Sequence, residues 1–325
     1  MRALVHSSFG EAEDVLRLEE RPVPTPGPGQ VLLRVVLSPI HNHDLWTIRG
    51  TYGFVPDLPA PAGTEALGIV EALGEGVEHL QMGQRVATGG TFGAWAPYLV
   101  AHAAGLIPVP EGLSDESAAQ LVSMPFSTIS LLQSLDVAEG QWIVQNAANG
   151  AVGRMLTQLG AARGVRVLGL VRRAEGVEEL RSQGIENVVA TDQDGWREEV
   201  ARLLDGAEPA VGVDSVGGAA SGEVLSLLAE GGTLVAFGAM GSPVMELASG
   251  DVIFKQATVK GFWGSKVIQQ LDPAIRAELF GELIRRVTDE TLTLPVAGVF
   301  DAADAADAVR LSKSAGRVGK VLLRF

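Results

Sequence analysis

The sequence contains no cysteine among its 325 residues. Without thiols the chain can form neither a disulfide nor a CxxC redox pair, and it can supply neither a thiolate nucleophile nor a thiolate ligand for zinc. Basic residues are also in deficit, with 25 Lys and Arg against 39 Asp and Glu and a formal net charge of −14. This balance argues against nucleic acids and anionic membranes as partners, because such polyanions bind basic surfaces.

Long apolar runs are missing as well. The longest uncharged segments, residues 86–110 and 117–135, are interrupted by prolines, glycines and polar residues, whereas a membrane span needs about 20 consecutive apolar residues. The first residues, 1–6, have a strand-like pattern and lack the features of a signal or transit peptide. We therefore expect a cytoplasmic protein with no membrane partner. The length fits two domains, at ~100–200 residues per domain.

The pattern of apolar residues changes along the chain. The first third carries short runs of Val, Leu and Ile bounded by Gly and Pro, which predict strands. From about residue 117 to 263, short apolar runs alternate with helical patterns, which is typical of a parallel, doubly wound sheet. A helix is expected at Pro273–Thr288 and a terminal strand at Lys320–Phe325.

A turn of small residues follows the apolar run Trp142–Gln145. Gly150 would let the backbone approach a pyrophosphate, whose charge the free N–H groups of the following helix would bind. Such a short pattern also occurs in ordinary strand–turn–helix units, but its place in an alternating α/β segment favours a dinucleotide site. The residues that we assign to the cofactor in this way are Asn146, Ala147, Asn149, Gly150, Ala151, Val152, Gly153 and, after a later strand, Gly238.

Two arginines stand where such a fold recognises the ribose of the cofactor. The apolar run Arg166–Val171 is followed by Arg172 and Arg173, about 20 residues after the turn of small residues. A site for NAD has a carboxylate there, which would repel a 2′-phosphate, whereas guanidinium groups bind this phosphate. The sequence thus predicts NADPH as the cofactor. The alternative is that both side chains lie in solvent at the end of a strand.

These features resemble the medium-chain dehydrogenase/reductase superfamily over essentially the whole chain. The Gly-Thr-Tyr-Gly block at 50–53 and the Gly-Phe-Trp block at 261–263 are more discriminating and resemble 2-enoyl thioester reductases of the mitochondrial fatty-acid-synthesis type. The resemblance implies an α/β fold in which residues 1–118 and 264–325 form a GroES-like, β-rich catalytic domain. Residues 119–263 would form a Rossmann domain with a doubly wound parallel sheet.

The zinc ligands of alcohol dehydrogenases in this superfamily are replaced. Their cysteine position is His41 here, and the histidine of their Gly-His-Glu block is Thr64. A catalytic zinc needs three protein ligands and an open position. His41, His43, Asp44 and Glu65 are an alternative ligand set, but we expect no metal and interpret Asp44 and Glu65 as buried polar groups.

Reduction of an activated C=C bond is chemistry that needs no zinc. Hydride adds to the β-carbon of an enoyl thioester or enone, and the enolate is protonated at the α-carbon. A phenol is protonated at neutral pH and can donate this proton. The resemblance implies that role for Tyr52, although a loop tyrosine taken alone would be a packing residue.

The resemblance also implies two residues of the substrate pocket. It places Trp263 near the acyl group, and the alternative is a core or interface role. His43 stands where the family usually has Ser or Thr beside Asp44, so we expect it to shape the pocket or relay protons. A homodimer through the edge of the Rossmann sheet near residues 259–263 is implied as well.

Several functions stay open. The first hypothesis is a zinc-free, NADPH-dependent reductase of an enoyl-CoA or a related enone, and the second is a quinone oxidoreductase, which needs no dedicated proton donor. A zinc alcohol dehydrogenase and a non-catalytic NADPH-binding protein are weaker alternatives. Because carrier proteins are acidic, a thioester of CoA is favoured over one of a carrier unless a local basic patch exists. The residues that could form that patch are Arg49, Lys255, Lys260 and Lys266.

Overall fold

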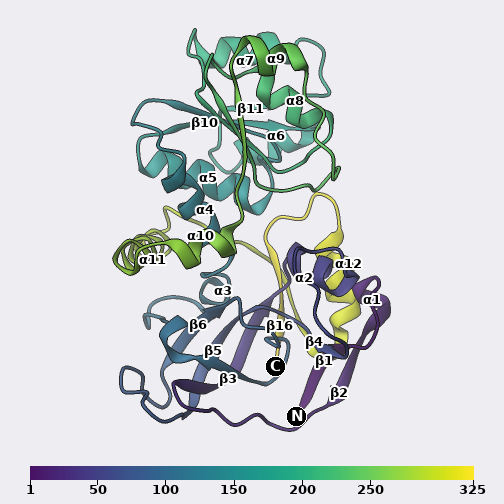
Figure 1. Ribbon diagram of the computed structural model, residues 1–325, viewed down its shortest axis with the longest axis vertical. Coiled ribbons are helices and arrows are strands. Elements are labelled where there is room, and N and C mark those ends of the chain that lie inside the picture. The colour runs from purple at the N-terminus through teal and green to yellow at the C-terminus, as the bar shows by residue number, and fades with distance from the viewer. The chain divides into compact units, whose positions relative to one another are not determined.

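Strands and loops make up most of the chain before residue 124, and strands alternate with helices after it (Figure 1). The computed structural model describes residues 1–325, which divide into two units. Unit 1 comprises Met1–Met124 and Thr293–Phe325, and unit 2 comprises Pro125–Leu292.

Unit 1 is built on two sheets. A seven-stranded sheet has the order β15-β16-β3-β5-β6-β8, with β7 paired to β3, and a three-stranded sheet has the order β2-β1-β4. The strands of the larger sheet are β3 (Gln30–Pro39), β5 (Glu65–Leu73), β6 (Arg85–Gly89), β7 (Tyr98–His102), β8 (Ile107–Pro108), β15 (Val296–Asp301) and β16 (Lys320–Arg324). Those of the smaller sheet are β1 (Arg2–His6), β2 (Leu16–Glu20) and β4 (Ala60–Pro61).

Short helices connect these strands. They are α1 (Ala12–Val15), α2 (Asn42–Arg49), α3 (Asp115–Ala118) and α12 (Ala305–Lys313), with single 3-10 turns at Ala103–Gly105 and Ala302–Asp304. The core includes Trp95, which is fully buried. Gly63 has a φ of +84°, and a Cβ there would lie 2.2 Å from Cδ1 of Trp95. Only glycine fits this position, and the chain thereby enters β5 with Thr64 and Glu65 inside the protein.

Unit 2 contains a six-stranded sheet in the order β11-β10-β9-β12-β13-β14, and every neighbouring pair is parallel. Its strands are β9 (Trp142–Gln145), β10 (Arg166–Val171), β11 (Val188–Ala190), β12 (Val211–Asp214), β13 (Thr233–Ala236) and β14 (Thr258–Gly261). The chain order reverses between β9 and β12. At such a switch point the carboxyl ends of the strands leave room for a ligand.

Helices accompany this sheet. They are α4 (Met124–Ser134), α5 (Ala151–Ala162), α6 (Ala174–Arg181), α7 (Trp196–Leu204), α8 (Ala219–Ser226), α9 (Ser249–Phe254), α10 (Gly264–Gln270) and α11 (Pro273–Thr288). The two units together confirm the predicted α/β class, with a β-rich part and a doubly wound parallel sheet. No helix combines the length and the apolar composition that crossing a membrane requires.

The division into units differs from the predicted boundaries. Unit 2 begins at Pro125 and extends to Leu292, whereas the sequence predicts a Rossmann domain of residues 119–263. The later boundary arises because α11 packs within unit 2. Phe280 of this helix stacks on Phe126 with ring centroids 4.0 Å apart, and Glu282 accepts a hydrogen bond from Arg163 at 2.7 Å. These contacts join segments far apart in the chain, and no local pattern announces them.

Candidate active site

In unit 1, the first turn of α2 carries two of the polar residues singled out from the sequence. Its preceding residue, His41, has an extended backbone, and its N–H donates to Oδ2 of Asp44 at 2.9 Å. This bond caps the helix, and the acidic side chain lies where the helix dipole favours a negative charge. Gly50 ends the helix with a φ of +79°, and the loop that follows carries Tyr52.

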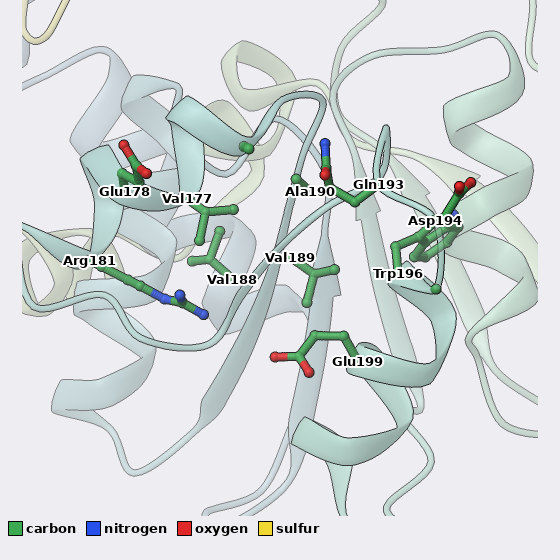
Figure 2. A pocket seen from close by; sticks show the side chains of 12 residues that line it. Val177, Glu178, Arg181, Val188, Val189, Ala190, Gln193, Asp194, Trp196 and Glu199 are labelled. Atoms are coloured by element: carbon green, nitrogen blue, oxygen red, sulfur yellow. The ribbon is translucent and has the colours of Figure 1, made fainter.

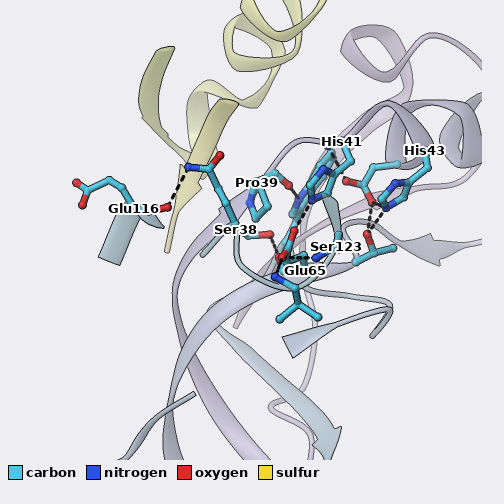
Figure 3. A network of polar contacts seen from close by, with 12 residues as sticks. Ser38, Pro39, His41, His43, Glu65, Glu116 and Ser123 are labelled. Carbon is cyan, nitrogen blue, oxygen red and sulfur yellow. Dashed lines mark hydrogen bonds and ion pairs between the residues drawn. The ribbon is translucent and has the colours of Figure 1, made fainter. Parts of the chain in front are cut away.

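A buried carboxyl lies at the centre of the unit 1 network (Figure 3). Oε1 of Glu65 accepts from the backbone N–H groups of Val122 at 2.6 Å and Ser123 at 2.8 Å. Its Oε2 lies 2.5 Å from Nε2 of His41, and both side chains are almost completely buried. Both oxygens of Glu65 therefore have partners inside the protein.

Burial also shifts the protonation of this network. It raises the pKa of Glu65 to about 7, although the two backbone N–H groups act in the opposite direction. It lowers the pKa of His41 well below its usual value, so this ring is neutral at neutral pH. The proton between Oε2 and Nε2 lies on the carboxyl when Glu65 is neutral and on Nε2 when Glu65 is ionised. Lys320 is half-buried, and desolvation lowers its pKa to about 8.

A second chain of hydrogen bonds starts at His43. Thr64 donates its hydroxyl hydrogen to Oδ1 of Asp44 at 2.7 Å. The same hydroxyl oxygen lies 2.8 Å from Nε2 of His43 and must accept there, which assigns a proton to Nε2. The ring of His43 also stacks on His41, with centroids 4.8 Å apart. His43 is therefore held in one orientation from two sides.

The structure brings Tyr52 next to this chain. Its ring centroid lies 5.9 Å from that of His43 and 6.5 Å from that of Trp46. Tyr52 is partly buried rather than enclosed in the core. The two residues predicted from the sequence for proton donation and for the pocket are thus neighbours in unit 1.

The four residues considered as an alternative ligand set are bound to one another or to the backbone. His41 contacts Glu65, and Asp44 accepts from Thr64 and from the backbone of His41. No group of three or more His, Cys, Asp or Glu side chains has the arrangement of a metal site. Chemistry without metal stays our prediction for this site.

In unit 2, the turn of small residues joins β9 to α5. Ala147 has a positive φ of +49°, and the N–H of Gly150 donates to its carbonyl at 2.8 Å. The first helical bond runs from the N–H of Arg154 to the carbonyl of Gly150 at 3.0 Å. The N–H groups of residues 151–153 precede it, so they have no carbonyl partner within the helix. No acidic residue lies in this first turn, which suits an anion.

A close approach explains the second glycine of the turn. A Cβ on Gly153 would lie 2.7 Å from the carbonyl oxygen of Ala147 and 2.7 Å from Cα of Ala148. A larger residue would therefore push the helix away from the strand. These residues fit a dinucleotide, because the backbone forms a tight turn and leaves free N–H groups at the start of the helix, where a pyrophosphate binds in such folds.

Asn146 links the two loops at the switch point. Its Nδ2 donates to Oδ1 of Asp214 at 2.6 Å, and its Oδ1 accepts from the N–H of Ser215 at 2.7 Å. Both ends of this side chain thus have partners inside the protein, and its role in binding the cofactor stays a prediction. Gly238 lies against the same loop, since its N–H donates to the carbonyl of Asp214 at 3.2 Å.

Asp214 is a further polar residue of the switch point, and it was not among the site residues predicted from the sequence. It is fully buried and accepts hydrogen bonds from the N–H groups of Val216 and Gly217 and from the hydroxyl of Ser221. An acidic residue at the end of an apolar run and before a Gly-Gly pair was a usable signal, because such a carboxylate needs several donors when it is buried.

Arg172 and Arg173 follow β10 and are exposed. Nε of Arg173 lies 4.0 Å from Oε2 of Glu175, at the limit of an ion pair, and 55% of its side chain is accessible. Both guanidinium groups are therefore accessible to a ligand. Trp263, directly before α10, is 42% exposed, and the ammonium of Lys266 lies 5.3 Å from its ring centroid. This tryptophan is not a core residue of unit 2.

Comparison with known proteins gives one family match in the β-rich part of the chain and one in the part with the parallel sheet. A family model described as the alcohol dehydrogenase GroES-like domain matches residues 27–111, and one described as zinc-binding dehydrogenase matches residues 151–278. The mitochondrial enoyl-acyl-carrier-protein reductase of Homo sapiens is 31% identical over 302 residues, which cover 91% of this chain and 81% of that protein. The chain belongs to the medium-chain dehydrogenase/reductase superfamily, in its zinc-free branch.

Solved structures of this superfamily match along the whole chain. The quinone oxidoreductase of Thermus thermophilus, solved alone and with NADPH, is 28% identical with a TM-score of 0.85, and the match covers 100% of both chains. The quinone oxidoreductase of Pseudomonas syringae is 26% identical with a TM-score of 0.88 and covers 100% of this chain and 99% of the other. The predicted superfamily and fold class are thereby confirmed.

Unit 2 contains a cavity of about 290 Å³ that is not lined by any of the residues assigned to the cofactor. It is found at the β11 edge of the sheet, between α6 and α7 (Figure 2). Glu178 and Arg181 line it from α6, and Trp196 and Glu199 line it from α7. None of the site residues predicted from the sequence lines this cavity.

Proposed function

We propose that this chain is a zinc-independent, NADPH-dependent oxidoreductase that reduces the C=C bond of a 2-enoyl thioester, such as an enoyl-CoA, or of a related enone. The observation that carries this proposal is Tyr52 beside His43, whose orientation Thr64 and Asp44 maintain. The relatives add support, because they are named enoyl-acyl-carrier-protein reductases and quinone oxidoreductases.

The residues of unit 2 suited to the cofactor are the N–H groups at the start of α5 and two arginines. The helix start would bind the pyrophosphate, and Arg172 and Arg173 would bind the 2′-phosphate with charge-assisted hydrogen bonds. Bound there, NADPH supplies the hydride that the β-carbon of the substrate receives. The named complex of the Thermus enzyme with NADPH supports the same cofactor for this chain.

The residues of unit 1 would complete the reduction with a proton. The phenol of Tyr52 donates it to the α-carbon of the enolate, and the tyrosinate takes a replacement from solvent. We assign His43 to passing that proton, because its ring centroid lies 5.9 Å from that of Tyr52 and its Nε2 is bound to Thr64. Buried His41 and Glu65 do not take part in this transfer; they fix the start of α2 and the segment at Val122.

A CoA thioester or a small enone suits the observed surface better than an acyl-carrier protein. Among the basic residues considered for a docking patch, Arg49 is bound to Glu11 at 2.9 Å. Lys255 donates to the carbonyls of Ser226 and Leu228 at 2.6 and 2.9 Å. These two charges are bound within the protein, which leaves Lys260 and Lys266 of the four for an acidic partner.

Quinone reduction is the second candidate, and the full-length match to quinone oxidoreductases favours it. A quinone needs the cofactor and an open site but no proton donor of its own. The discriminating experiment compares NADPH consumption with crotonyl-CoA, longer enoyl-CoAs and a quinone in parallel. Turnover of enoyl-CoA above that of the quinone supports our proposal, whereas turnover of the quinone alone replaces it with the second candidate.

We also propose that the chain forms a homodimer through the free edge of β14. Apolar side chains are exposed on and before this strand, with Val259 at 41%, Ile253 at 63% and Phe254 at 81%. An edge strand with such neighbours is protected by pairing. Sedimentation equilibrium tests this proposal, and a monomer at micromolar concentration would contradict it.

A further inference from the structure

One buried arginine of unit 2 belongs to neither of the cofactor contacts described above. Arg154 lies in the first turn of α5 and is 6% exposed. A guanidinium group stays charged, and its burial is costly unless all of its donors find partners. The hydrogen-bond partners of Arg154 therefore indicate which segments of the chain it holds together.

Arg154 uses each part of its guanidinium group. Its Nε donates to the backbone carbonyl of Asn149 at 3.0 Å. Its Nη2 donates to Oε1 of Glu179 at 2.5 Å, and its Nη1 donates to the side-chain oxygen of Gln183. Glu179 belongs to α6 and Gln183 follows that helix. The side chain of Arg154 thus connects the turn of small residues to α6 and to the residue Gln183 that follows it.

The contact to Asn149 completes a fixed peptide unit. The carbonyl of the Asn149–Gly150 peptide binds Arg154, and its N–H donates to Ala147 at 2.8 Å. With both polar groups bound, this peptide plane cannot rotate without losing one hydrogen bond. The N–H groups that begin α5 follow directly, so their direction depends on this plane.

We propose that Arg154 is a positioning residue for the cofactor pyrophosphate. It holds the Asn149–Gly150 peptide so that the N–H groups of residues 151–153 are directed at the phosphates before the cofactor arrives. This role rests on the proposed cofactor site but is independent of the substrate. Because NADPH and NADH share the pyrophosphate, loss of Arg154 weakens both cofactors by a similar factor.

The geometry of the side chain matters as well as its charge. A lysine at this position retains one positive charge for Glu179, but its single ammonium cannot also reach Asn149 and Gln183 in the planar arrangement of a guanidinium. Arg154→Lys therefore separates charge from positioning. Arg163 provides the matched control. It lies at the opposite end of the same helix and forms an ion pair with Glu282 at 2.7 Å, so it has no contact with the turn in this pair.

The test is direct titration of NADPH and NADH, by protein fluorescence, into the wild-type chain and the variants R154Q, R154K and R163Q. We expect R154Q and R154K to raise the Kd of both cofactors by about tenfold. R163Q should leave both Kd values unchanged. Thermal unfolding of each variant is measured alongside to separate loss of fold from loss of affinity.

Each result decides the role of Arg154. A wild-type Kd in folded R154K overturns the positioning role even if R154Q fails to fold, and so does an equal loss of affinity in R163Q. Wild-type protein that binds neither cofactor overturns the proposed cofactor site together with this inference. Cofactor binding that depends on Arg154 without any enoyl-CoA turnover supports the inference and contradicts only the proposed substrate.

Discussion

The hydrogen-bond network of unit 1 and the turn of small residues in unit 2 position polar groups in different ways. Unit 1 uses side chains, and Glu65 and His41 satisfy one another deep inside the protein. Unit 2 uses the backbone, where residues 146–153 form a tight turn and leave N–H groups free at a helix start. The first arrangement depends on protonation and the second does not. We therefore expect changes in pH to act on unit 1 and changes in cofactor charge to act on unit 2.

Of the changes considered, Tyr52→Phe should have the largest effect on activity, because it removes the proposed proton donor of unit 1 and leaves the backbone turn of unit 2 intact. We expect the rate of enoyl-CoA reduction to fall about 10²–10⁴-fold, with the Kd of NADPH unchanged. Stopped-flow or steady-state NADPH consumption measures the rate. Tyr98→Phe, at the only other tyrosine and on β7, is the control and should retain wild-type turnover.

Glu65→Gln tests the dependence of unit 1 on protonation. Glutamine retains an oxygen for Val122 and Ser123 and an N–H for the ring of His41. In the wild type, the pKa of Glu65 is about 7 in the folded protein, against an ordinary value of 4.5. A raised pKa stabilises the fold below the unfolded value and loses this contribution as pH rises through the folded value.

The stability of the wild type relative to Glu65→Gln should therefore decline by about 3 kcal/mol between pH 4.5 and about 7. Urea unfolding of both proteins at several pH values measures this difference. A constant difference across the range would show that Glu65 titrates normally. Glu65→Ala, which leaves two buried N–H groups without an acceptor, should destabilise at every pH.

Replacement of Arg172 and Arg173 by alanine addresses unit 2. The double variant should raise the Kd of NADPH about 10–100-fold and change that of NADH little, because only NADPH carries the 2′-phosphate. Competitive titration of both cofactors measures the ratio. Arg166→Ala, at the opposite end of β10, removes a charge away from the site and should keep the preference. Equal losses for NADPH and NADH would remove the two arginines from phosphate recognition.

Arg49→Ala should have the smallest effect. Its ion pair with Glu11 is partly exposed, with 38% and 43% of the two side chains accessible. Such pairs contribute less than about 1 kcal/mol to the free energy of unfolding. Thermal unfolding and turnover of crotonyl-CoA should both be close to wild type. A large loss of turnover with carrier-bound substrate alone would indicate that this arginine docks a carrier protein.

Local patterns predicted the elements of unit 2 well. The runs Trp142–Gln145 and Arg166–Val171 are the strands β9 and β10, and the expected helix Pro273–Thr288 is α11. These elements repeat a local rule, in which apolar strands are buried on both faces and small residues mark the turns. The extent of unit 2 was not predictable in this way, since the place of α11 depends on Phe126 and Arg163, more than a hundred residues away in the chain.

The network of unit 1 was predicted only in part. Asp44 and Glu65 are buried polar groups, as expected, and Tyr52 and His43 are neighbours. The bond between His41 and Glu65 and the chain from His43 to Asp44 could not be predicted, because each joins α2 to the start of β5. Such bonds depend on the distance and angle between two elements, and the sequence contains no measure of either.

The sequence by itself determined the alternation of strands and helices in unit 2, the small residues of the cofactor turn and the replacement of the zinc ligands at His41 and Thr64. These are properties of single residues and their neighbours in the chain. Only the tertiary structure decided that Glu65 shares a proton with His41 and that Arg154 holds the turn from α6. Burial and hydrogen-bond geometry arise when distant segments meet, and they determine protonation and orientation.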